Sequence, residues 1–322
     1  MLHKLITIVS VALFASGALP AAAQVWPNKP IRMIVAFPPG GPTDIVARVL
    51  AQKLGEQLGQ QLLVDNKPGA GGNIGAELAA KAAGDGYTIF YNTSAIVINP
   101  ALYGRASYDT LKDFTPVALT AAIPMVLVVN PQVPARTMKE FVEHVRARAG
   151  QINYSSSGSG TITHLASAML ASHMGLAATH VPYKGSAPGL VDLAAGQTQF
   201  MTDTINTALP YIKDGRLRGI AVTSLRRSTV LPDLPTFSES GLPGFDAAAW
   251  QGVVVPAGTT AEIVARLNGE INKALTDTGV RTRLAAQGAD VFGGSAAEYA
   301  SYIRSEMPRW AKAVKDSGAK AE

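Results

Sequence analysis

Short apolar segments alternate with longer segments of helical period along most of the chain. Residues 31–37 form the first apolar segment, and residues 45–58 repeat apolar side chains at steps of three and four, as one face of a helix does. Strands that alternate with helices in this way are typical of βαβ units and of a mostly parallel sheet. The pattern predicts an α/β protein.

The same alternation continues to the end of the chain. It predicts further strands at 61–64, 87–91, 114–129, 152–155, 179–181, 199–201, 217–223 and 249–255, and further helices at 75–83, 141–149, 161–174, 187–195, 209–213, 261–276 and 296–314. The strand at 114–129 is interrupted by Pro124 and is a candidate crossover between two lobes. We expect residues 24–125 and 249–322 to form the first lobe and residues 126–248 the second.

The break between the first strand and the first helix has the composition of an anion-binding loop. Residues 38–41 read Pro-Pro-Gly-Gly, Thr43 stands where an N-cap is expected, and Asp44 falls in the first helical turn. Glycines let the backbone approach a ligand, and the first N–H groups of a helix have no partner within it. The sequence therefore predicts one wall of a binding site here.

A second loop repeats this arrangement in the second lobe. Residues 154–161 read Tyr-Ser-Ser-Ser-Gly-Ser-Gly-Thr and precede the helix that carries His164. Open α/β sheets bind ligands at the carboxyl ends of their strands, so the two loops should face each other, with Thr93 and Ser94 nearby. Two helix N-termini on one cleft suit a carboxylate. The alternative is that both loops are ordinary turns between strand and helix.

Composition is that of a folded chain with a thinly spread positive charge. The 322 residues are 47% apolar and 16% charged, with a net charge of +5 and no run of Lys and Arg alternating with aromatic residues. The chain can bury a full core, and nothing in it favours nucleic-acid binding. No cysteine is present, which excludes a disulfide and a lipid-anchored N-terminal cysteine.

Residues 1–23 have the pattern of an export signal. A short polar start with Lys4 precedes the apolar stretch 5–19 and three alanines at 21–23. A membrane anchor is the weaker interpretation, because the apolar run is shorter than the roughly 20 residues that span a bilayer. We expect an exported, soluble periplasmic protein that starts near Gln24.

Several motifs in a fixed order resemble those of one known family. They are Trp-Pro at 26–27, Lys-Pro-Ile at 29–31, Phe-Pro-Pro-Gly-Gly at 37–41 with Asp44, Asn-Lys-Pro-Gly-Ala-Gly-Gly at 66–72, Asp-Gly-Tyr-Thr at 85–88, Tyr-Ser-Ser-Ser-Gly at 154–158 with His164, Val-Pro-Tyr-Lys-Gly at 181–185, Leu-Pro-Asp-Leu-Pro-Thr at 231–236 and Pro-Ala-Gly-Thr at 256–259. In these motifs the chain resembles the Bug-type periplasmic receptors, the substrate-binding subunits of tripartite tricarboxylate transporters. The resemblance covers essentially the whole chain after the export signal.

The resemblance implies a two-lobed periplasmic-binding-protein fold of type II, with a mostly parallel sheet flanked by helices in each lobe. It implies a solute-binding protein, not an enzyme, that closes on a dicarboxylate or an aromatic carboxylate and delivers it to membrane components of the transporter. Together with the loops above, it gives the predicted ligand-binding residues Phe37, Gly40, Gly41, Thr43, Asp44, Thr93, Ser94, Ser156, Ser157, Gly158, Thr161, His164, Lys184 and Asp203. Two positions depart from the family pattern: Thr161 replaces a common serine, and Thr202 replaces a common aromatic residue.

Other kinds of site are weaker interpretations. Glycines at 69, 71 and 75 resemble a dinucleotide fingerprint with stretched spacing, but no acidic residue ends the next strand, so we expect a tight turn and no cofactor. No histidine pair has zinc-site spacing, so we expect no metal. Lys184 has two interpretations that both stay open, a counter-charge for an anionic ligand and a solvated side chain. Arg48, four residues after Asp44, is expected to form an ion pair on the helix surface. We also expect a monomer.

The rival function from a different class is a periplasmic serine hydrolase. It would use a serine of the 155–161 loop with His164 as its base. The loop lacks the Gly-x-Ser-x-Gly spacing of a nucleophile elbow, and no acidic residue stands at a spacing that would orient His164. Turnover of a ligand would distinguish a hydrolase from a binding protein.

Overall fold

The computed structural model describes residues 26–104 and 107–320. The predicted export signal at 1–23 lies outside the described residues. None of the helices in the described part of the chain combines the length and the apolar character that a membrane span requires.

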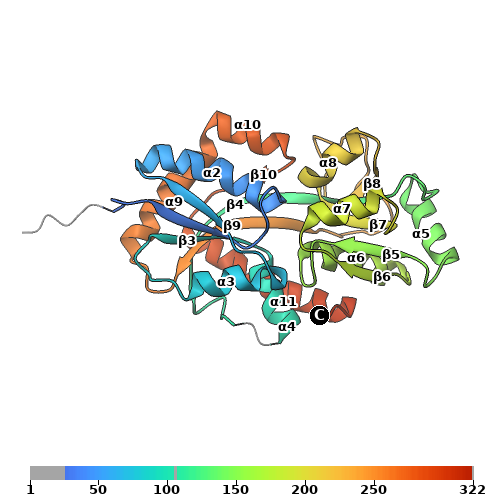
Figure 1. The fold of residues 1–322 in the computed structure, drawn as a ribbon, viewed down its shortest axis with the longest axis horizontal. Coiled ribbons are helices and arrows are strands. Elements are labelled where there is room, and N and C mark those ends of the chain that lie inside the picture. Colours follow the sequence, from blue (N-terminus) through green and yellow to red (C-terminus); the bar gives the residue numbers. More distant parts are fainter. Residues whose placement is uncertain (1–25, 105–106, 321–322) are drawn as a thin grey trace, which may run out of the picture.

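Two groups of strands and helices lie side by side (Figure 1). We name them the first and the second lobe. The first lobe holds β1 (Ile31–Val35), α2 (Pro42–Leu58), β2 (Leu62–Asn66), η1 (Ala70–Gly72), α3 (Asn73–Ala80), β3 (Thr88–Thr93), α4 (Ala95–Tyr103), β9 (Ala248–Pro256), α9 (Ala261–Thr276), α10 (Thr278–Ala286), β10 (Asp290–Val291) and α11 (Ala296–Ser317). The second lobe holds α5 (Met138–Ala147), β5 (Asn153–Ser156), α6 (Ile162–Met174), β6 (Thr179–Pro182), α7 (Ser186–Ala194), β7 (Phe200–Thr204), α8 (Ile205–Lys213) and β8 (Arg218–Val222).

One long strand, β4 (Phe114–Val129), belongs to both lobes. It pairs with β9 as far as Pro124 and with β7 and β8 from Met125 onward, without interruption at the proline. The pairing partner of β4 therefore changes between Pro124 and Met125. The full assignment of residues to lobes remains a prediction.

The sheet is mixed, so the prediction of mostly parallel sheets was only partly right. β1 pairs in parallel with β2 and β3, and β5 pairs in parallel with β6 and β7, as their βα connections require. The pairs that involve β4 or β9 are antiparallel. The chain passes from the first lobe to the second along β4 and returns along β9, so these two strands run in opposite directions.

Apolar residues cover both faces of the first-lobe sheet. The buried face of α2, which includes Val46, Leu50 and Leu54, packs with α9 against one face. On the other face Gly75 of α3 lies so near β1 that a Cβ atom there would come within 2.8 Å of the Ala36 Cα atom. This close approach explains the last glycine of the 69–75 segment as a packing residue.

The C-terminal helix α11 joins the two lobes from below the sheet (Figure 1). It packs against α4 of the first lobe, α6 of the second lobe and the crossing strand β4. Its buried Glu306 accepts hydrogen bonds from the indole N–H groups of Trp250 on β9 (2.9 Å) and Trp310 (2.7 Å). This helix therefore fixes the crossing strands on the side opposite α2.

Candidate functional site

The first wall of the cleft is the N-terminus of α2. Pro42 occupies the first helical turn and Gly41 is the N-cap, which makes no side-chain capping hydrogen bond. The prediction that Thr43 is the N-cap was wrong, because Pro42 is compatible with the first helical position and so begins the helix two residues earlier than predicted. Thr43 lies inside the first turn and is buried.

Asp44 stabilises the loop of this wall from the side away from the cleft. Its carboxylate accepts hydrogen bonds from the Gly40 N–H group, the Arg48 Nε atom and the Asn66 Nδ2 atom, each at 2.9 Å. Burial raises the pKa of this carboxyl, but the hydrogen bonds from Arg48, Gly40 and Asn66 outweigh burial and hold the pKa below its usual value. The predicted ion pair of Arg48 is present, and Asp44 acts as a brace for the loop.

The second wall is the N-terminus of α6. Side-chain hydroxyls stand here, whereas the first wall has backbone N–H groups without a side-chain cap. Thr161 is the N-cap, and its Oγ1 atom accepts from the His164 N–H group. The Thr163 Oγ1 atom contacts the hydroxyls of Ser157 and Thr161, each at 2.9 Å, and accepts from the Ser157 N–H group at 2.8 Å. Because each of these hydroxyls can donate or accept, the network can reorient toward a ligand.

A histidine pair lies behind the second wall. His164 and His180 stack with ring centroids 3.8 Å apart, and Ser156 Oγ lies 2.6 Å from His180 Nε2. Burial lowers the pKa of His180 to about 4. The Ser156 side chain is fully buried, so it cannot reach a substrate as a nucleophile. This pair therefore supports the loop, and Ser156 is not accessible as a nucleophile.

Five helix N-termini converge between the two walls. Besides α2 and α6, the cleft is lined by Ala95 and Ser186, the first residues of α4 and α7, and by Thr204, the N-cap of α8. Lys184 is the cation of the lining, and no acidic side chain lines the cleft within the described residues. N-terminal N–H groups and positive helix ends favour a negatively charged ligand.

The two lobes meet around this cleft. A Cβ atom on Gly185 would come within 3.2 Å of the Pro38 ring, and Asn206 Nδ2 of α8 donates to the Pro42 carbonyl at 3.5 Å. The enclosed cavity has a volume of about 60 Å³, far below the roughly 300 Å³ of the smaller drug-sized pockets. A ligand of several carbon atoms needs more space than this cavity offers.

The predicted site residues divide into those that line the cleft and those behind it. The lining includes Phe37, Gly41, Thr43, Thr93, Ser157, Thr161 and Lys184. Behind it lie Gly40, Asp44, Ser94, Ser156, Gly158, His164 and Asp203. Each of the second group neighbours a lining residue in the chain or through a hydrogen bond, so these residues can shape the cleft without touching its interior.

Asp203 illustrates this supporting position. It is fully buried and accepts hydrogen bonds from the hydroxyls of Ser186 and Thr207, each at 2.8 Å. Burial raises the pKa of its carboxyl to about 6. Asp203 thereby connects the N-termini of α7 and α8, which both line the cleft.

Sequence reasoning missed several lining residues. Thr163, Ser186 and Thr204 supply hydroxyls to the cleft, and Pro188, Ala187 and Ala249 supply apolar surface. The strand–loop–helix signal that located the first two walls also precedes α7 and α8, and could have located Ser186 and Thr204. The apolar residues carry no such signal.

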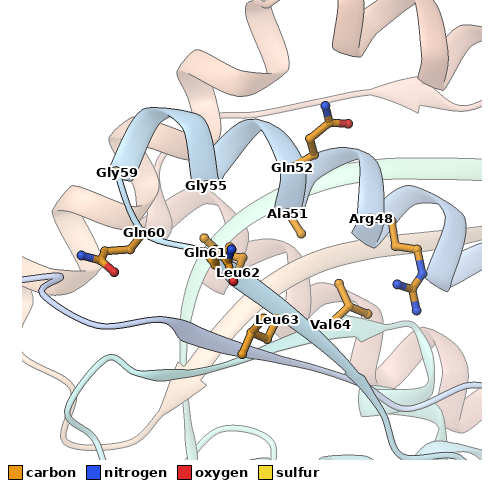
Figure 2. Close-up of a pocket in the computed structure, with 10 residues that line it drawn as sticks. All are labelled: Arg48, Ala51, Gln52, Gly55, Gly59, Gln60, Gln61, Leu62, Leu63 and Val64. Atoms are coloured by element: carbon orange, nitrogen blue, oxygen red, sulfur yellow. The ribbon is translucent and has the colours of Figure 1, made fainter.

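A second hollow, larger and more open, lies on the far side of α2. It has a volume of about 780 Å³ between α2 and the edge strand β2 (Figure 2). It is lined by glycines, glutamines and aliphatic side chains, and Arg48, its only charged lining residue in the described part of the chain, is bonded to Asp44 and Asn66. No predicted site residue lines this groove, so its size does not indicate a binding site. The described residues contain no group of three or more His, Cys, Asp or Glu side chains that could hold a metal.

Comparisons with known proteins all lead to the same family. The model of the tripartite tricarboxylate transporter family receptor matches residues 46–319. Protein BugT from Bordetella pertussis is 37% identical over 320 residues, which cover 98% of each chain.

Two solved structures of similar proteins contain a small organic acid. An R. palustris protein solved with adipate is 35% identical with a TM-score of 0.89, covering 92% of this chain and 99% of its own. MatC from Rhodopseudomonas palustris, with bound malate, is 34% identical with a TM-score of 0.85, covering 90% of this chain and 100% of its own. These matches confirm the periplasmic-binding-protein type of fold and a solute-binding protein rather than an enzyme. The chain belongs to the tripartite tricarboxylate transporter receptor family, as its motifs predict.

Proposed function

We propose that this protein captures a small organic carboxylate in the cleft and delivers it to the membrane components of a tripartite tricarboxylate transporter. A dicarboxylate is the favoured ligand, because similar structures hold adipate and malate. An aromatic carboxylate is the second candidate within this class.

The observation that carries the proposal is the lining of the cleft. Five helix N-termini and several hydroxyls face one small volume, with Lys184 as the lining cation and no lining carboxylate among the described residues. Fixed N–H dipoles bind an anion without the loss of side-chain freedom that flexible cations would require. One carboxylate at each wall would use both α2 and α6.

The mechanism is hinge closure. β4 and β9 connect the lobes, and α11 packs across them, so a bend in the crossing strands would open the cleft. Closure brings the α6 wall onto a ligand held by α2. The closed surface is then the form that a membrane partner would recognise.

Export to the periplasm is part of the same proposal. It rests on the signal-like residues 1–23, and the mature chain is expected to be a monomer that starts near Gln24. Size-exclusion chromatography with light scattering checks the oligomeric state.

A thermal-shift screen of the mature protein tests the function. The panel contains aliphatic dicarboxylates, hydroxy acids, aromatic carboxylates and acidic amino acids at one pH. A ligand at 100 times its Kd should add about 2.7 kcal/mol to the free energy of unfolding, which raises Tm by several degrees. The bound compound should be recovered unchanged. Absence of any shift, together with hydrolysis of a model ester, would overturn the proposal in favour of a hydrolase.

A further inference from the structure

Gln251 has a buried side chain that belongs to neither of the two walls. It lies on β9, is fully buried, and neither its Nε2 nor its Oε1 atom has a hydrogen-bond partner among the described residues. Buried polar groups in folded proteins almost always have a partner, so an amide with two unpaired ends calls for a specific explanation.

Gln251 is not among the residues that line the cleft, but strand geometry places its side chain next to two residues that do. Successive side chains of a strand point to opposite faces, so Gln251 shares a face with Ala249, which lines the cleft. Gln251 is also paired directly with Thr93 of β3, and directly opposed residues of antiparallel strands have Cβ atoms about 5 Å apart on one face. Thr93 lines the cleft as well.

The neighbours of Gln251 confirm which face it occupies. Trp250 donates to Glu306 of α11, and a Cβ atom on Gly252 would come within 2.4 Å of the Tyr299 ring of the same helix. Both therefore face α11, and Gln251 faces the opposite side, where Thr93 and the N-terminus of α2 lie.

We propose that Gln251 is a specificity-determining residue at the floor of the cleft, where its amide hydrogen-bonds a bound hydroxycarboxylate directly or through one enclosed water. This inference rests on the proposed function. The amide supplies a donor and an acceptor, so it can pair with a ligand that offers both an anionic oxygen and a hydroxyl. A ligand without the hydroxyl leaves the amide oxygen unpaired, and the cleft therefore favours a hydroxy acid over the matching plain acid.

The test compares malate with succinate, which differ by one hydroxyl, on the wild type and on Gln251→Leu. Calorimetric titration at fixed pH should give tighter binding of malate to the wild type, by about tenfold. Gln251→Leu should lose this preference and bind malate about tenfold more weakly. The Tm without ligand should stay the same or rise, because an unpaired buried amide is replaced by an apolar side chain of similar size.

Gln57→Leu is the matched control. Gln57 lies near the C-terminal end of α2, far along the helix from the cleft, and donates to Glu270 of α9 through its Nε2 atom. The same substitution there should lower Tm and leave both affinities unchanged.

The two proposals fail in different ways. If neither malate, succinate nor any other carboxylate of the panel binds the wild type, the proposed function fails. If the wild type binds these acids and Gln251→Leu binds them with unchanged affinity and preference, the inference about Gln251 is wrong and the proposed function stands.

Discussion

The N-terminus of α2 presents bare backbone N–H groups to the cleft, whereas that of α6 presents a network of hydroxyls. In the first wall the carboxylate of Asp44 is occupied by Gly40, Arg48 and Asn66. In the second wall Ser157, Thr161 and Thr163 bond to one another. The first wall thus presents fixed donors for the proposed anionic ligand, and the second can rearrange its donors. The two walls should therefore respond differently to substitution.

Asp44→Ala should have the largest effect, because it removes the brace of the fixed wall. The Gly40 N–H group and the Asn66 amide lose their acceptor, which costs about 1–3 kcal/mol of stability, and the disordered loop should bind ligand at least tenfold more weakly. Urea unfolding and calorimetric titration measure the two effects.

Arg48→Ala is the control for this variant. Arg48 is half exposed and forms an i,i+4 pair with Asp44, so its loss should cost only a few tenths of a kcal/mol and leave affinity nearly unchanged. Equal effects of the two substitutions would show that the ion pair, rather than the loop hydrogen bonds, supports the wall.

Ser157→Ala should separate affinity from stability in the second wall. Its half-buried hydroxyl bonds to Thr163, which keeps a second partner in Thr161, so stability should change by less than about 1 kcal/mol. Loss of one donor to a carboxylate should weaken binding about tenfold. Thermal unfolding and titration check this, and a large loss of stability with full affinity would reverse the assigned roles of the two walls.

The smallest predicted effect is the dependence of stability and of ligand affinity on pH. The carboxyl of Asp203 has a pKa raised to about 6 by burial, against about 3.9 in the unfolded chain, so the folded protein holds this proton more tightly. Its contribution to stability is therefore full below about pH 4 and is lost as pH rises through 6. When it is ionised, the Asp203 carboxylate behind Ser186 also repels an anionic ligand in the cleft.

Affinity should accordingly rise about fivefold from pH 7.5 to 5.5 in the wild type. Asp203→Asn removes the titrating group and should flatten this change, and comparison of the two proteins with one ligand cancels the titration of the ligand. An identical pH profile in both proteins would remove Asp203 from any role in binding.

Local signals predicted most of the helices and the two loops that precede α2 and α6. The pattern gave α9 with its observed ends and placed Thr161 at the start of α6. It missed α4, because this helix is apolar on all sides and contains Pro100, so it shows no amphipathic period. The N-cap of α2 was misplaced because a proline at the first helical position outweighed the side-chain cap at Thr43.

Contacts between distant segments could not be read from the sequence. His164 and His180 come together because β5 and β6 pair, with Tyr154 opposite His180. Gln251 stands among apolar strand residues, and only its pairing with Thr93 places it below the cleft. The antiparallel crossing of β4 and β9 likewise follows from the path of the whole chain rather than from any local motif.

The most direct test of the account is calorimetric titration of the mature protein with the carboxylate that gives the largest thermal shift. We predict one saturable site per chain in the wild type, and no detectable binding when Asp44→Ala and Ser157→Ala are combined, because the first wall then loses the brace of its loop and the second wall loses a hydroxyl donor. A folded double variant that binds with wild-type affinity would contradict the placement of the ligand between the two helix N-termini.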